Sequence, residues 1–292
     1  MRMPGVLLLA LAALACGGTG SPDAPTRLSV AASIPPHGWL VERIGGDAVE
    51  VAVVLGPGDS PATHQPSDAQ VSRVLASRVF FSSGVPFESG AWFDAVAGAL
   101  EVVALDRGIA DRRMDAHHHD ATHDHGSSGN GLDPHAWLSP GRLAEQAQRV
   151  SVELSRLDPD RAAIYAGNLN SLNAGLGELD RWIRATLTPH RGRAFVVFHP
   201  SWGYFADDYD LEQIAIETEG KEPSDAEITD LQREARERGV SVVFVQPQIA
   251  GRSARAVAEA IGADLVTLDP LAADVPANLR RTAAAIAGSF DE

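Results

Sequence analysis

Histidine is the residue type whose placement in this chain points most directly to chemistry. A ten-residue run at 116–125, AHHHDATHDH, holds five of the ten histidines: His117, His118, His119, His123 and His125. A sixth, His135, follows in the stretch 132–140, LDPHAWLSP. Neutral imidazole is the commonest metal ligand in proteins, and short His-rich tracts are typical of metal binding. We therefore expect a loose metal-collecting loop beside one fixed ligand. The alternatives are a solvated polar loop and a structural histidine.

Three further candidate ligands stand at or just beyond the ends of predicted strands. His64 lies in the loop 56–66, His199 follows a run of apolar residues, and Asp269 follows the last such run. Because ligands in open α/β sheets bind outside the carboxyl ends of the strands, these side chains can meet at one cleft. Three imidazoles and one carboxylate suit zinc, whereas calcium and magnesium prefer all-oxygen ligands. The only cysteine, Cys16, excludes a site built from several thiolates.

The elements that must position these residues follow from alternating apolar runs and helical patterns. Strands are predicted at 28–33, 49–55, 78–82, 101–105, 194–198, 212–216, 240–245 and 264–268, and helices at 38–44, 67–76, 92–100, 139–157, 224–238, 253–261 and 275–287. This alternation predicts an α/β fold of two lobes, each with a mainly parallel sheet flanked by helices. The spacing of apolar residues over 158–187 predicts one long rigid helix that joins the lobes.

The N-terminus has the pattern of an export signal. Residues 1–15 carry one arginine before a short apolar run that is too short to span a bilayer. Cys16 comes directly after small residues, which resembles a bacterial lipoprotein signal with Cys16 as the lipidated residue; a plain secretory signal is the alternative. We expect a tether at 17–26, a first lobe at 27–157, a connecting helix at 158–188 and a second lobe at 189–292.

The charge balance narrows the classes of partner. The chain has 24 Lys and Arg against 39 Asp and Glu, a net charge of −15. Nucleic-acid binders are usually basic, so we expect no nucleic acid, whereas a negative field attracts cations. A zinc hydrolase would keep an open coordination position, with Glu217, Glu219 or Glu222 as conceivable bases. No HExxH motif supports that alternative, and we expect no enzymatic activity.

Several segments resemble the zinc-binding receptors of bacterial ABC importers, the ZnuA/TroA-like family. They cover essentially the whole mature chain and lie at 32–47, 132–140, 199–205, 217–223, 243–249 and 268–272. The resemblance implies a TroA-like fold, with Zn²⁺ in the cleft between the lobes and a His-rich loop ahead of the second ligand. It also implies delivery of zinc to an ABC permease and its ATPase. We expect a lipid-anchored monomer in the periplasm or on the outer face of the cytoplasmic membrane.

The resemblance assigns ligand positions residue by residue. His135 in DPHAWLSP and His199 in the FHP motif match histidine ligands, and Asp269 in LDPLA matches the carboxylate ligand. In the manganese-binding members of the family, the resemblance implies a Glu at the position of His199. The His at this position therefore favours zinc, with manganese as the alternative.

The first ligand position departs from the family pattern. The family commonly has SPHxYEP, whereas residues 60–66 read SPATHQP, so that Ala62 stands where the histidine is expected. In an extended chain, residues two apart point to the same side, and His64 would then reach the same metal. We rank His64 first, with His37 or a water molecule as the substitute ligand.

Overall fold

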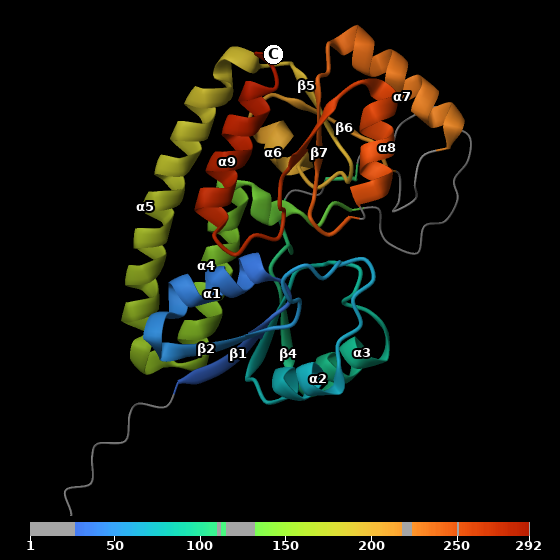
Figure 1. Ribbon diagram of the computed structural model, residues 1–292. Helices are drawn as coiled ribbons and strands as arrows, with labels where there is room; N and C mark the ends of the chain where they lie inside the picture. Colours follow the sequence, from blue (N-terminus) through green and yellow to red (C-terminus); the bar gives the residue numbers. More distant parts are fainter. Residues whose placement is uncertain (1–26, 110–111, 115–131, 218–223, 250, 292) are drawn as a thin grey trace, which may run out of the picture.

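The computed structural model describes residues 27–109, 112–114, 132–217, 224–249 and 251–291. Figure 1 shows two α/β lobes, one above the other, with the long helix α5 (Ala162–Leu187) running beside both. In these described ranges no helix is long and apolar enough to cross a membrane. Cys16 and the five histidines of 117–125 lie outside them, so the predictions for these residues stay predictions.

The first lobe is built on a parallel sheet with the strand order β2-β1-β3-β4. The strands are β1 (Leu28–Ala32), β2 (Val49–Val53), β3 (Val79–Ser82) and β4 (Glu101–Ala104), and the helices between them are α1 (Pro35–Gly45), α2 (Asp68–Leu75) and α3 (Gly90–Ala99). Val30, Phe80 and Phe81 are fully buried between these layers. The predicted parallel sheet is thereby confirmed.

The second lobe repeats this plan with the strand order β6-β5-β7-β8, again with every pair parallel. Its strands are β5 (Ala194–Val197), β6 (Glu212–Ala215), β7 (Val242–Val245) and β8 (Asp264–Thr267), and its helices are α6 (Gly203–Asp208), α7 (Asp225–Arg238), α8 (Gly251–Ile261) and α9 (Val275–Gly288). The short helix α6 was not predicted, because six residues are too few for a helical repeat to show in the sequence.

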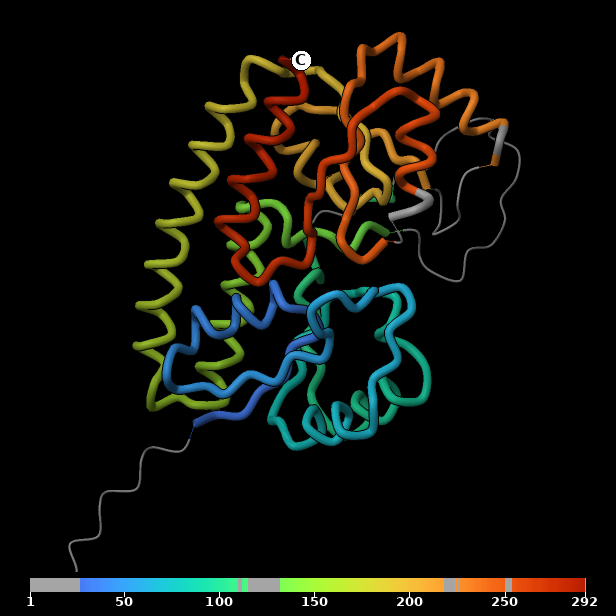
Figure 2. The backbone as a smooth tube through the Cα atoms, viewed as in Figure 1, coloured from blue at the N-terminus to red at the C-terminus, as the bar shows by residue number. Residues whose placement is uncertain are grey.

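Helix α5 is the element shared by the two lobes. It packs against α1 and α4 (Pro140–Leu157) on the side of the first lobe, and against α9 on the side of the second. Figure 2 shows α9 returning along α5 toward the C-terminus. The buried side chains of α5 follow the predicted apolar spacing, and they include Tyr165, Leu176 and Ile183. At ~1.5 Å per residue, its 26 residues span about 39 Å, enough to reach both lobes.

The start of α5 differs from the prediction. A separate 3-10 turn occupies Pro159–Arg161, and the α-helix begins only at Ala162. The Asp158 carboxylate receives hydrogen bonds from Arg161 at 2.7 Å and from the Tyr165 hydroxyl at 2.9 Å. These bonds close the turn between α4 and α5, so the two helices leave it as a packed pair.

A buried polar network lies in the first lobe where α1 meets the ends of the strands. His37, in the first turn of α1, is fully buried; its Nδ1 lies 2.6 Å from Ser83 Oγ and its Nε2 lies 3.2 Å from Gln146 Oε1. Burial lowers the pKa of His37 to about 4. The Glu88 carboxylate accepts bonds from the backbone N–H groups of Ser83 at 2.7 Å and Gly84 at 3.0 Å, and burial raises its pKa to about 7.

These two pKa shifts should make opposite contributions to the pH dependence of stability. Between pH 6.5 and about 4, a falling pH protonates His37 only in the unfolded chain, which lowers the free energy of unfolding. Between pH 4.5 and about 7, a rising pH ionises Glu88 only in the unfolded chain, which also lowers it. In the wild-type protein, we expect the combined contribution of His37 and Glu88 to the free energy of unfolding to change little between pH 5 and 6, because the two slopes offset each other.

Glu88→Gln should expose the His37 slope. Relative to wild type, the free energy of unfolding of this variant should fall by about 1.4 kcal/mol as the pH is lowered from 6 to 5. Urea titrations of the chelator-treated protein at several pH values measure this slope, and the exposed Glu50, replaced by Gln, serves as the control. A Glu88→Gln variant that keeps the wild-type pH dependence would show that Glu88 is ionised in the folded protein.

Candidate metal centre

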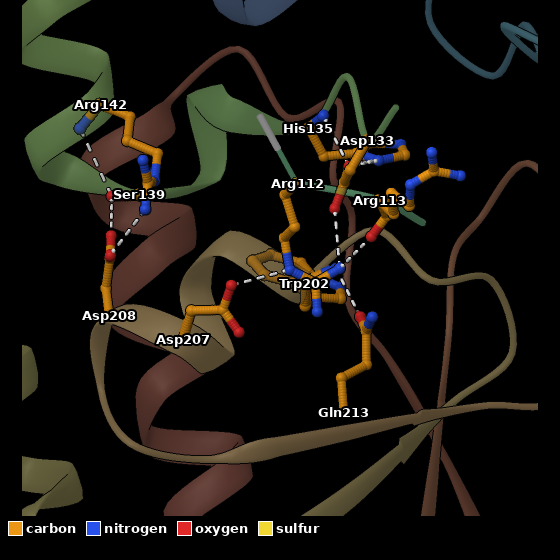
Figure 3. Close-up of polar contacts among 10 residues, drawn as sticks. All are labelled: Arg112, Arg113, Asp133, His135, Ser139, Arg142, Trp202, Asp207, Asp208 and Gln213. Carbon is orange, nitrogen blue, oxygen red and sulfur yellow. Dashed lines mark hydrogen bonds and ion pairs between the residues drawn. The ribbon is translucent and has the colours of Figure 1, made fainter. Parts of the chain in front are cut away.

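His135 is held by a carboxylate two residues before it. Asp133 Oδ1 accepts a hydrogen bond from the His135 backbone N–H at 2.9 Å and lies 2.7 Å from its Nδ1 (Figure 3). Because the carboxylate accepts a hydrogen bond from Nδ1–H, the lone pair of the neutral imidazole is on Nε2, the arrangement that orients metal-binding histidines. Burial lowers the pKa of His135, with the hydrogen bond to Asp133 acting in the opposite direction. Burial thus favours the neutral ring, which is the form that binds metals.

His199 lies in the other lobe, two residues after β5, and it too has a carboxylate at its Nδ1. Its Nδ1 lies 2.5 Å from Glu217 Oε1, just beyond the end of β6. The centroids of the His199 and His135 rings are 5.3 Å apart, with an angle of 76° between the ring planes. Two imidazoles, each with a carboxylate on Nδ1, thus meet edge to face where the lobes face each other.

Asp269 lies on the loop after β8. Its Oδ1 accepts hydrogen bonds from Gln248 Nε2 and from the backbone N–H of Leu271, both at 3.0 Å. The next carbonyl, that of Pro270, accepts a bond at 2.7 Å from the indole N–H of Trp137, two residues after His135. This bond ties the loop of Asp269 to the turn of His135 across the two lobes.

His64 lies on the loop between β2 and α2, against the ring of Phe87 at 5.4 Å between centroids. Its Nδ1 is 3.2 Å from Asp59 Oδ2, and its buried Nε2 has no hydrogen-bond partner among the residues that the structure describes. Leaving a buried polar nitrogen unpaired costs about 1–3 kcal/mol, a cost that a bound metal would remove. His64 Nε2 is therefore suited to bind a metal ion.

The chain before His64 is turned, not extended as predicted. The backbone N–H groups of Thr63 and His64 both donate to the carbonyl of Ser60, so that the chain turns at this point. Side chains two residues apart share a side only in a strand. His37, which falls just before the helix predicted at 38–44, lies on α1, where both of its ring nitrogens have partners. A metal could bind His37 only by breaking one of those bonds.

The candidate ligands are brought together unequally. His135 and His199 are in ring contact, the loop of Asp269 is bonded to the turn of His135, and His64 is held by Asp59 and Phe87. Within the described parts of the chain, no three His, Cys, Asp or Glu side chains form a group that could hold a metal ion. The four-residue ligand set therefore stays a proposal about the metal-bound protein.

The sequence did not identify the two carboxylates that hold the imidazoles. Asp133 had a local signal, because it stands two residues before His135 in the same motif. Glu217 had none, since it is 18 residues from His199 and reaches it only because β5 and β6 are neighbours in the sheet. Glu217 was considered only as a hydrolytic base, whereas its carboxylate lies against His199.

Comparisons with known proteins agree with the two-lobed α/β fold. A family model described as ZnuA, "Zinc-uptake complex component A periplasmic", matches residues 30–287. A crystal structure of a ZnuA deletion mutant with zinc bound superposes with a TM-score of 0.81 and 36% identity, covering 90% of this chain and 98% of that one. The high-affinity zinc uptake system protein ZnuA of Paracoccus denitrificans is 29% identical over 281 residues, which cover 84% of this chain and 82% of the relative.

A longer relative is also similar. The zinc-binding lipoprotein AdcA of Streptococcus pneumoniae is 24% identical over 282 residues, which cover 93% of this chain but 56% of AdcA. The chain thus spans about half the length of the AdcA relatives that it matches. The two parallel sheets, the long helix beside them and the match over nearly the whole chain lead to one conclusion. This chain belongs to the ZnuA family, whose model describes the periplasmic component of a zinc-uptake complex.

Proposed function

We propose that this protein is an extracytoplasmic receptor that captures Zn²⁺ between its lobes and delivers it to an ABC permease driven by an ATPase. The observation that carries the proposal is the contact between His135 and His199, each with a carboxylate at Nδ1. Zinc binds neutral imidazole, and outer carboxylates of this kind fix the ring and strengthen it as a ligand. The names of the relatives, which include a zinc uptake protein and a zinc-binding lipoprotein, support the choice of metal.

The proposed tight site consists of His64, His135, His199 and Asp269. Three imidazole nitrogens and one carboxylate oxygen fill the four positions that zinc takes in a closed site. Capture then needs only ligand exchange, in which the bound waters of Zn²⁺ are replaced by protein atoms. The net charge of −15 adds a long-range attraction for the cation.

The remaining parts of the proposal concern residues outside the described ranges. The histidines of the loop 117–125 would gather zinc near the cleft rather than hold the transported ion. Cys16 would carry a lipid that anchors a monomeric receptor to the membrane beside its permease. A receptor of this kind works by binding and release, and we propose no catalysed reaction.

Removing either paired imidazole should abolish tight zinc binding. We expect His135→Ala and His199→Ala each to weaken the affinity by at least about 100-fold, more than the 10–100-fold typical of losing an outer-shell partner. Competition titrations against a zinc-binding dye measure the change. His190→Ala is the control, because the His190 ring packs on Phe290 in another part of the second lobe. Near-wild-type affinity in both variants would remove the proposed function.

Glu217 should matter for zinc although it is not a proposed ligand. Glu217→Gln keeps the size of the side chain but removes the charge that holds the Nδ1 proton of His199, and we expect a 10–100-fold loss of affinity. Glu212→Gln, at the exposed start of the same strand β6, is the matched control. If the two variants bind zinc equally well, the carboxylate at His199 does not contribute to binding.

The His-rich loop should supply only weaker sites. Deleting residues 116–125 should leave one tight zinc site and remove the others, as isothermal titration calorimetry would show in the stoichiometry. A loop of the original length with its five histidines replaced by Ser controls for the change in length. Loss of the tight site in both forms would reverse the roles that we assign to the loop and the cleft.

A further inference from the structure

One arginine connects the proposed ligand His135 to the opposite lobe. Arg112 Nη1 lies 3.4 Å from Asp133 Oδ2, and its Nε donates a hydrogen bond to Asp207 Oδ2 at 2.9 Å (Figure 3). The other oxygen of Asp133 is the one that holds His135. A continuous chain of charged contacts, which we call the Arg112 bridge, therefore runs from Asp207 on α6 through Arg112 and Asp133 to His135.

The first-lobe end of the bridge is fixed by the backbone. Residue 113 pairs with residue 132 in an antiparallel bridge, and the backbone N–H of Asp133 donates to the carbonyl of Arg112 at 2.7 Å. The Asp133 side chain is completely buried. Arg112 and Asp133 thus move together, and the contact with Asp207 is the one that crosses to the second lobe.

The guanidinium of Arg112 also packs against Gly203 of the second lobe. A Cβ atom on Gly203, the first residue of α6, would overlap it, with Nε only 2.7 Å away and Nη1 and Cζ closer still. A side chain at position 203 would therefore displace the guanidinium, which can move because it is the far end of the flexible Arg112 side chain. The bridge depends on shape as well as on charge.

Helix α6 is held against the first lobe at a second point. The carboxylate of Asp208 receives a hydrogen bond from Ser139 Oγ and one from Arg142 at 3.2 Å, and Arg142 lies over the ring of Tyr204 at 4.5 Å from its centroid. Tyr204 in turn is buried with Ile109 and Ala136. These contacts dock α6, and the Arg112 bridge is the contact that extends from the docked helix to a proposed zinc ligand.

We propose that Arg112 is a positioning residue that makes the orientation of His135 depend on the docking of α6, and so couples separation of the lobes to release of zinc. A guanidinium presents several N–H donors in one rigid plane, so a single group addresses both carboxylates. When α6 moves away from the first lobe, Arg112 loses its hydrogen bond to Asp207 and its packing contact with Gly203. Asp133 Oδ2 then loses its contact with Arg112, and the orientation of the His135 imidazole is less strongly fixed. This inference rests on the proposed function.

The test compares rates of zinc loss from the full-length protein to an excess of chelator. We expect Arg112→Gln and Gly203→Ala each to release zinc about 10–100-fold faster than wild type, as for other outer-shell partners. The double variant should be no faster than either single variant, because both remove the same bridge. Gly98→Ala is the matched control, since nothing lies within 4 Å of a Cβ at that helical position.

A third variant covers the case in which Gly203→Ala disturbs the packing of α6. The side chain of Asp207 is 52% exposed, so Asp207→Asn should fold normally and also release zinc faster. Asp210→Asn, which removes the exposed pair with Arg191 on the same lobe, should release zinc at the wild-type rate. Melting temperatures of the chelator-treated variants separate a loss of folding from a loss of positioning.

The outcomes distinguish this inference from the proposed function. If wild type and His135→Ala hold zinc equally weakly, the proposed function fails and the inference fails with it. If wild type holds zinc tightly and His135→Ala does not, but Arg112→Gln and Asp207→Asn release it at the wild-type rate, only the inference is overturned. Additive effects of Arg112→Gln and Gly203→Ala would also overturn it, because the two substitutions would then act separately.

Discussion

The structure of the proposed centre depends on one interaction, the hydrogen bond between a carboxylate and the Nδ1 of an imidazole. It occurs twice, from Asp133 to His135 in the first lobe and from Glu217 to His199 in the second. A neutral imidazole has one N–H and one lone pair, so a carboxylate that accepts a hydrogen bond from one nitrogen leaves the other nitrogen free to bind a metal. In the proposed centre both rings are thereby oriented before an ion binds, and an oriented ligand loses less entropy on binding.

The fold supplies the two pairs in different ways. Glu217 and His199 meet because the parallel strands β5 and β6 are neighbours in the sheet, whereas Asp133 stands two residues before His135 in the same turn. Helix α5 packs on both lobes, and the bond from Trp137 to Pro270 joins the His135 turn to the Asp269 loop. Separating the lobes would break this bond together with the contacts of α6. The positions of the proposed ligands His135 and Asp269 relative to each other are therefore set by contacts between the lobes.

Much of the fold could be predicted because its signals are local. The buried strands, the capped helix at Ser67 and the apolar spacing of α5 each follow from residues within one segment, and the structure has them within a few positions of the prediction. The errors have the same cause. The turn at Ser60 and the short helix α6 are too brief to show periodicity, so the direction of His64 and the docking of Asp207 and Asp208 were not foreseen.

The sequence by itself determined the two α/β lobes, the long connecting helix and the identity of the histidines and the acid that could bind a metal. These follow from residue type and from spacing along the chain, which need no knowledge of what lies across a gap. Only the tertiary structure decided that Glu217 holds His199, that both nitrogens of His37 are occupied, and that Arg112 joins Asp133 to Asp207. Those contacts link residues up to 109 positions apart, and packing rather than local sequence brings them together.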